Sequence, residues 1–136
     1  MLMRKILLSL CVLFFSSCAQ NPIPNEEFTL ENTQWKLVSF GYKRMAVPKN
    51  VWISFKEGIY SGHCACNGMG GAYEVDKNTL EIKAGISRLI ACPDMRLETK
   101  IRQEIQEVNS YKFENKQLIL MHGKEAILNF IEVPSE

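Results

Sequence analysis

The sequence lacks an excess of charge of either sign. Its 16 Lys and Arg residues stand against 15 Asp and Glu residues, so the formal net charge at pH 7 is +1 over 136 residues. A protein that binds DNA or RNA needs a surplus of basic groups, because these groups must replace the counterions along the phosphates. The composition therefore argues against nucleic-acid binding. The length allows one domain, and the 46% hydrophobic content suits a packed core.

The sequence also lacks a hydrophobic run long enough to cross a membrane as a helix. The apolar run from Ile6 to Phe15 would span about 15 Å as a helix, half of a bilayer core. Arg4 and Lys5 precede this run, and small residues follow it. A charged start, a short apolar centre and a small-residue end are typical of a secretory signal peptide, which we place at residues 1–17.

The end of this signal resembles a bacterial lipobox. In Phe15-Ser16-Ser17-Cys18, small residues come directly before a cysteine whose thiol would carry the lipid. The resemblance implies lipidation at Cys18, durable anchoring by two or more acyl chains, and location in the cell envelope. Ala19 after the cysteine favours the outer membrane, facing the periplasm. An ordinary secretory cleavage site around Ser17 is the alternative. Residues 18–29, which are polar and contain two prolines, are predicted to form a tether.

Cysteine and histidine are scarce in the rest of the chain. If Cys11 leaves with the signal and Cys18 is lipidated, three thiols remain: Cys64, Cys66 and Cys92. On an extended strand Cys64 and Cys66 would face the same side, so either could bridge to Cys92. Export permits a disulfide, and closing a loop of this length would contribute about 3–4 kcal/mol.

The few histidines give little support for a metal site or a catalytic site. His63 and Cys64 are the weak candidates for metal ligands, with Cys66, Cys92 and His122 as their potential partners. Cys-x-Cys is not the spacing of zinc knuckles, and neighbouring residues on a strand point to opposite faces. A catalytic thiolate would need one of only two histidines as its base. We therefore predict no metal, no cofactor and no enzymatic activity.

Short alternating segments separated by turn residues dominate the domain, which we place at residues 30–136. Strands are predicted at 34–40, 51–56, 59–62, 72–75, 80–83, 111–113, 118–121 and 126–133, and residues 86–91 are mostly apolar. So many short strands must hide their edges, which favours a closed or nearly closed barrel. The predicted fold is thus α+β, with a small antiparallel, barrel-like sheet of about eight strands.

One segment, 93–108, has the period of a helix. Its apolar residues from Leu97 to Val108 recur at intervals of four, four and three residues. Pro93 suits the first helical turn, and Glu98 and Arg102 are spaced for an ion pair. We expect this helix to pack on the sheet rather than to bind a partner.

Glycines concentrate in residues 58–73, which hold five of the eight in the chain. A phosphate-binding loop is excluded, because a strand-like segment follows and the sequence has no Gly-Lys-Ser/Thr. Asn67 tolerates a positive φ, and the glycines allow tight turns and close backbone contacts. The segment is therefore predicted to be structural.

The same residues carry a resemblance to the META domain family, also called HslJ-like. The resemblance begins at Trp35-Lys36-Leu37 and continues in Ala91-Cys92-Pro93-Asp94 with Glu98 six residues after the cysteine. The sequence departs from the family at Ala65, where the family usually has glycine, and at Arg88, where threonine is common. The central family-motif residues are Gly62, Cys66, Asn67, Gly71, Tyr73 and Cys92.

The resemblance implies a small α+β barrel without an established reaction, and a role in heat or envelope stress or in novobiocin resistance. It implies that Cys66, Asn67 and Cys92 are structural or site-forming residues at one end of the sheet, with the two cysteines paired. Two other functions remain open. One is a module that binds a metal or small ligand through the Cys/His cluster. The other is an envelope protein-interaction module that exposes Phe40, Tyr42 and Trp52.

Overall fold

The computed structural model of the protein describes residues 28–44, 46–85 and 89–134. The predicted signal peptide, Cys18 and most of the tether lie outside these described residues. The described elements are β1 (Thr33–Phe40), β2 (Lys43–Arg44), β3 (Val51–Lys56), β4 (Ile59–Cys64), β5 (Gly68–Asp76), β6 (Thr79–Ala84), α1 (Arg96–Glu107), β7 (Ser110–Glu114), β8 (Gln117–His122) and β9 (Glu125–Glu132).

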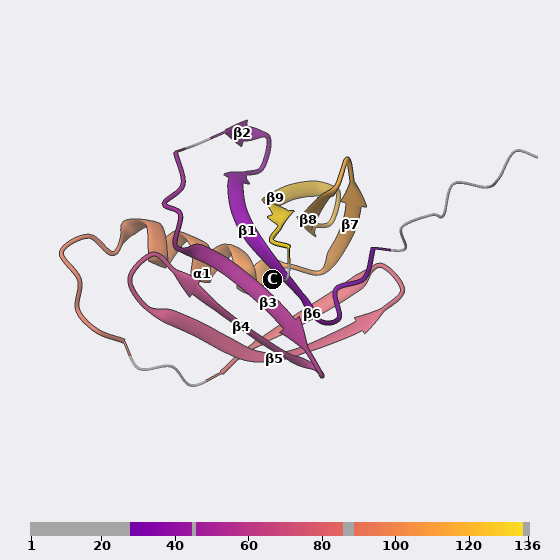
Figure 1. Ribbon diagram of the computed structural model, residues 1–136, viewed down its shortest axis with the longest axis horizontal. Helices are drawn as coiled ribbons and strands as arrows, with labels where there is room; N and C mark the ends of the chain where they lie inside the picture. Colours follow the sequence, from indigo (N-terminus) through magenta and orange to yellow (C-terminus); the bar gives the residue numbers. More distant parts are fainter. Residues whose placement is uncertain (1–27, 45, 86–88, 135–136) are drawn as a thin grey trace, which may run out of the picture.

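Eight of the strands form a closed antiparallel barrel. The strand order is β1-β3-β4-β5-β6-β7-β8-β9, and pairing of β1 with β9 closes the circle (Figure 1). The short strand β2 pairs with Ser39 and Phe40 of β1, beyond the residues of β1 that pair with β3. Closure gives each barrel strand a neighbour on both sides, which solves the edge problem of short strands. The predicted α+β fold with a barrel-like sheet is confirmed.

The strands alternate between the core and the surface as the sequence pattern predicts. In β3, Val51, Ile53 and Phe55 are fully buried. Trp35 and Leu37 of β1 face the same core. Phe40 is also buried, at 7% exposure, and Trp52 is half-buried, so the surface on which both would be exposed is not present. Tyr42 is the member of that group that is exposed, at 79%.

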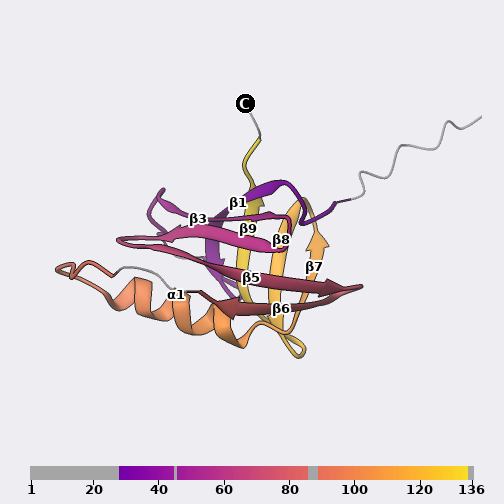
Figure 2. The same ribbon diagram turned by 90° about the horizontal axis from the view of Figure 1, so that it is seen from below.

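The helix α1 connects β6 to β7 and packs against β4, β6 and β9. Figure 2 shows it running along β6, below the strands. Ile101 and Ile105 turn into the core, which confirms the predicted apolar stripe. The helix starts at Arg96, later than Pro93: the Thr99 N–H donates to the Met95 carbonyl at 2.8 Å, and the side chain of Asp94 accepts the Arg96 N–H at 3.0 Å. This described helix lacks the length and apolar character needed to cross a membrane.

The seam between β6 and β7 is the weakest part of the barrel. In the part of the chain that the structure describes, these strands share one register pair, Thr79 with Ser110. Two backbone hydrogen bonds flank it, from Leu80 N–H to Asn109 and from Tyr111 N–H to Asn78. Beyond this point this edge of β6 lies beside α1 rather than beside another strand, so the helix covers that part of β6.

Candidate functional site

The turn between β4 and β5 is the centre of the family motif. The Cys64 N–H donates to the Asn67 carbonyl at 2.9 Å, which closes the turn. Ala65 within it has a φ of 79°, a left-handed conformation that favours glycine over residues with a Cβ. The positive φ therefore falls at Ala65 rather than at Asn67. The family resemblance implies a glycine at this position, and glycine would adopt this conformation without the cost of a Cβ.

Ala65, the residue with the left-handed φ, lies between Cys64 and Cys66. On a continuous strand these two cysteines would face the same side. Cys64 ends β4 and is fully buried, whereas Cys66 lies in the turn and forms a disulfide with Cys92. The Cα atoms of Cys66 and Cys92 are 6.6 Å apart, and 26 positions separate the two residues in the sequence. The expected pairing of Cys66 with Cys92 is confirmed. It ties the turn to the segment that leads into α1.

Cys64 keeps its thiol buried beside the Asn67 carbonyl. Its Sγ donates to the Asn67 carbonyl at 3.2 Å, and burial raises the pKa of the thiol to about 11. Because the thiolate is the reactive form of cysteine, this thiol is a poor nucleophile near neutral pH. His63 lies on the other face of β4, where its Nδ1 is 3.0 Å from the Asn50 carbonyl. The two weak metal candidates therefore point apart, as neighbouring strand residues should.

His122 lies at the far end of α1, with Nδ1 2.7 Å from the carbonyl of Glu107. It does not join Cys64 and His63 in one site. Among the residues with described positions, no group of three or more His, Cys, Asp and Glu side chains could hold a metal ion. The Cys/His cluster suggested by the sequence is thus not assembled in the fold.

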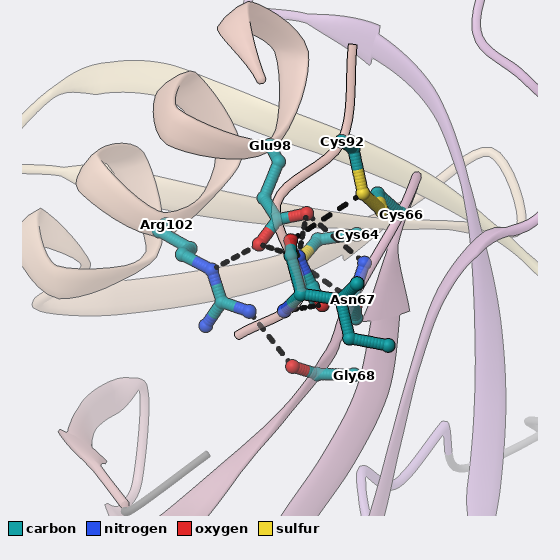
Figure 3. A network of polar contacts seen from close by, with 8 residues as sticks. Cys64, Cys66, Asn67, Gly68, Cys92, Glu98 and Arg102 are labelled. Atoms are coloured by element: carbon teal, nitrogen blue, oxygen red, sulfur yellow. Dashed lines mark hydrogen bonds and ion pairs between the residues drawn. A yellow bond between two sulfur atoms is a disulfide. The ribbon is translucent and has the colours of Figure 1, made fainter. Parts of the chain in front are cut away.

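Glu98 is the buried charge at the centre of this region, with 1% of its surface exposed. Its carboxylate accepts the Asn67 N–H at 3.0 Å, the Asn67 Nδ2 at 3.1 Å and the Arg102 Nε at 2.9 Å (Figure 3). Burial alone would raise the pKa of Glu98. The hydrogen bonds from Arg102 and Asn67 outweigh burial and lower the pKa, so the carboxylate stays ionised.

Arg102 also bonds to the turn between β4 and β5. Its Nη2 donates to the Gly68 carbonyl at 2.7 Å while its Nε holds Glu98 (Figure 3). The ion pair of Glu98 with Arg102 confirms the pairing predicted from the helix spacing. The spacing made no statement about exposure, and the structure shows that Glu98 is buried. A guanidinium suits this position because it donates in two directions from one rigid plane.

Asn67 uses its side-chain amide to hold a third segment. Its Oδ1 accepts the Ile90 N–H at 2.7 Å, and its Nδ2 donates to the Ile90 carbonyl at 3.0 Å. The residue is 3% exposed. An amide offers two N–H donors and an oxygen acceptor side by side, and Asp at this position would place a second negative charge against Glu98. Asn67 therefore joins the turn, the helix and the segment around Ile90.

The two glycines of the motif are needed for close packing between strands. A Cβ on Gly62 would overlap the Trp52 carbonyl and lie 2.8 Å from the end of the Met69 side chain. A Cβ on Gly71 would overlap the Lys83 carbonyl. Both positions are closed to larger residues by backbone atoms, which cannot move as a flexible side chain can. Their role is structural.

Tyr73 lies away from this turn, towards the opposite end of β4. It is 7% exposed and meets Phe55 edge to face, with ring centres 5.0 Å apart. Its hydroxyl donates to Glu31 at 2.5 Å. Burial, together with the neighbouring Glu31 carboxylate, raises the pKa of Tyr73 to about 12. The other Glu31 oxygen accepts the Glu57 N–H at 2.7 Å and so fixes the turn between β3 and β4.

The family model of the META domain matches residues 28–135. The chain belongs to the META domain family. Its buried turn at Cys66 and Asn67, joined to Cys92 and to Glu98 of α1, is therefore the structural form of the family motif in this chain.

Three solved structures are similar to this META domain in fold. One is a protein from Burkholderia xenovorans solved by NMR, with 17% identity over 78% of this chain and 85% of that chain, at a TM-score of 0.64. Another is the crystal structure of a DUF4847 family protein from Bacteroides vulgatus, with 16% identity over 77% of this chain and 95% of that chain, at a TM-score of 0.59.

The third is a protein solved by NMR, with 23% identity over 72% of this chain and 87% of that chain, at a TM-score of 0.55. At these identities the likeness concerns the fold alone. A search of curated proteins finds no match to this chain.

Proposed function

We propose that this META-domain protein is a non-enzymatic component of the bacterial envelope. In this proposal a lipid on Cys18 anchors it to the outer membrane, and the domain faces the periplasm and contributes to tolerance of heat, envelope stress or novobiocin. The lipobox-like segment supports the anchor, and the disulfide supports an oxidising compartment.

One observation carries the non-enzymatic part of the proposal. The chemically capable groups of the motif bond to one another: the carboxylate of Glu98 is held by Asn67 and Arg102, and Cys66 is joined to Cys92. The remaining thiol, Cys64, is protonated at neutral pH. Such a set fixes three chain segments in place, which is what a rigid binding or structural domain requires.

Two measurements, made one after the other, test the proposal. The intact mass of protein purified from membranes, recorded with and without reduction, should reveal acylation at Cys18 and one disulfide. A deletion strain should then lose survival under heat or novobiocin. The wild-type gene should restore survival, whereas Cys18→Ala should not. An unmodified Cys18 contradicts the anchor, and unchanged survival under both challenges contradicts the stress role.

A further inference from the structure

Basic residues are unevenly distributed along the chain. Residues 32–56 contain five Lys and Arg residues and no Asp or Glu, whereas the rest of the sequence has 11 basic and 15 acidic residues. This segment covers β1, β2, β3 and the loops between them, and the three strands are neighbours in the sheet. A chain that is close to neutral as a whole therefore carries a local positive charge on one side of the barrel.

The outer face of β1, β3 and β4 carries part of this charge. Lys36, Trp52 and His63 form a row across the three strands, because Trp52 is paired with both of the others. Ile53 and Cys64, which follow Trp52 and His63 in their strands, are fully buried. Since neighbouring strand residues point to opposite faces, the row faces away from the core.

The strands of this face contain no carboxylate. The row continues onto β9 at Ile131, which is paired with Lys36. Towards the turn after β3 lie two further rows whose members are uncharged or basic: Gln34, Ser54 and Ser61, then Lys56 and Ile59. Glu31 and Glu57 lie at the margin, in the contact at that turn. We call the outer surface of β1, β3 and β4 the basic face.

Apolar side chains are exposed on the basic face and beside it. Tyr42 follows the end of β1, where the chain turns into β2 (Figure 1), and is 79% exposed. Lys43 and Arg44 come directly after it. Ile59 and Ile131 are 57% and 40% exposed. Interfacial aromatic side chains combined with lysine and arginine are typical of protein surfaces that contact the headgroups of a bilayer.

The predicted anchor is long enough to bring this face to a membrane. Ten peptide units separate Cys18 from Phe28, the first described residue, and a chain of that length reaches at most about 35 Å. Phe28 lies against Phe113, which also contacts Trp35 near the beginning of β1. The tether thus joins the domain near one end of β1, and Tyr42 follows the other end. This arrangement allows β1 to lie along the membrane.

We propose that the basic face and Tyr42 lie against an anionic phospholipid surface when the chain is anchored. This proposal rests on the membrane location proposed above. Lys36, Lys43, Lys49 and Lys56 attract the lipid phosphates, each by about a factor of five in affinity, and Tyr42 enters the headgroup region. The anchor favours the bilayer over a soluble acidic protein, because it holds the membrane surface at a high effective concentration.

NMR of the full-length protein on lipid nanodiscs tests this orientation. The discs contain a lipid with a gadolinium-chelate headgroup, which broadens the signals of nearby amides. On discs of phosphatidylcholine with phosphatidylglycerol, the amides of Lys43, Trp52 and His63 should broaden strongly, and that of Lys112 on β7 should not. The difference should vanish on phosphatidylcholine alone and at high salt.

The outcome is separable from the proposed anchor. Acylation of Cys18 is read independently from the intact mass, and a chain without the lipid should show the same pattern of broadening when phosphatidylglycerol discs are in excess. A failure of the anchor therefore leaves the pattern, whereas a failure of the present proposal removes the pattern from acylated protein.

Two matched variants assign the contact to the basic face. The first removes three positive charges from this side of the molecule: Lys36→Gln, Lys43→Gln and Lys49→Gln. It should reduce the difference in broadening at least tenfold. The second removes the same charge from exposed positions in other turns and should retain the difference: Lys77→Gln, Lys116→Gln and Lys124→Gln. Equal losses in the two variants overturn the proposal. Wild-type protein without selective broadening also overturns it and favours an acidic protein as the partner of this face.

Discussion

At each end of β4 a glutamate carboxylate accepts a backbone N–H of the adjacent turn, but the two carboxylates differ in burial. At one end, Glu31 accepts the Glu57 N–H of the turn between β3 and β4. At the other end, Glu98 accepts the Asn67 N–H of the turn between β4 and β5. Glu31 is half-exposed and bonds to a tyrosine hydroxyl, whereas Glu98 is buried and is matched by Arg102.

The difference shows how burial changes what a carboxylate requires. In contact with water, Glu31 needs no positive charge bonded to it, because solvent screens its charge. Glu98 has lost that water, so it needs the guanidinium and the amide of Asn67 to remain ionised. The buried end should therefore be the one on which the stability of the domain depends, and the following changes test that comparison.

The largest effect is expected from Glu98→Ala. The substitution leaves the guanidinium of Arg102 and the N–H of Asn67 without their acceptor in a buried site, which should lower the free energy of unfolding by about 3–5 kcal/mol. Urea unfolding followed by circular dichroism measures the loss. Glu104→Ala on the same helix is the control, because Glu104 pairs with Lys100 at the surface. Equal losses in the two variants would contradict the comparison.

Removal of the disulfide should have the next largest effect. Replacing Cys66 and Cys92 by serine releases a loop with a sequence separation of 26. In the chain-entropy model the free energy of unfolding falls by about 3–4 kcal/mol. Wild-type protein unfolded in the presence of a reductant should show the same loss. Cys64→Ala is the control that retains the disulfide, and it should cost clearly less than the double substitution.

The pH dependence of stability should separate the buried carboxylate from the others. Because the folded state lowers the pKa of Glu98, the ionised group contributes stability that is complete above its unfolded pKa of about 4.3. This contribution is lost as the pH falls through the lower folded pKa. The stability difference between wild type and Glu98→Gln should therefore shrink as unfolding is measured from pH 6 towards pH 3.

Two other carboxyl groups with lowered pKa values, Asp94 and Glu31, serve as an internal control. They titrate in both proteins, so their effects cancel in the comparison. A difference between wild type and Glu98→Gln that stays constant over this pH range would show that Glu98 is not ionised as described.

Ala65→Gly should stabilise the protein. The left-handed φ of 79° costs a residue with a Cβ about 1–2 kcal/mol, and glycine gives back part of this through its more flexible unfolded chain. We expect a net gain of about 0.5–1 kcal/mol in thermal unfolding analysed at the transition midpoint. The same substitution at Ala72, within β5, is the control and should destabilise. A loss at Ala65 would contradict the backbone conformation of this turn.

The smallest effect is expected at the exposed end. Glu31→Gln retains an oxygen that accepts from Tyr73 or Glu57 and has no bonded positive charge to lose. The free energy of unfolding should change far less than in Glu98→Gln, measured in parallel by urea unfolding. A loss as large as that of Glu98→Gln would mean that the two ends of β4 are equivalent and that burial does not set the difference.

The sequence predicted most of the fold because its signals are local. The alternation of Val51, Ile53 and Phe55 and the helical spacing of Ile101 and Ile105 are visible within a few residues. The two-residue strand β2 carries no such pattern and was not predicted. The pairing of Cys66 with Cys92 came from the family resemblance, since spacing alone left Cys64 as an equal alternative.

The candidate site was less predictable because it depends on contacts between distant segments. Glu98 and Asn67 are 31 positions apart, and nothing in either segment alone reveals the hydrogen bonds between them. A signal for the burial of Glu98 did exist, because it lies three and seven residues before Ile101 and Ile105, on the same helix face.

The single register pair between β6 and β7 makes this seam the weakest boundary between two contiguous parts of the chain, β1–β6 and β7–β9. Their other boundary, β1 with β9, is a long ladder of paired residues. Local opening should therefore begin at Thr79 and Ser110, and amide hydrogens near this seam should exchange with solvent faster than those of β8. Because α1 joins these two parts and packs on β6, such an opening would also loosen the contact between the helix and the sheet.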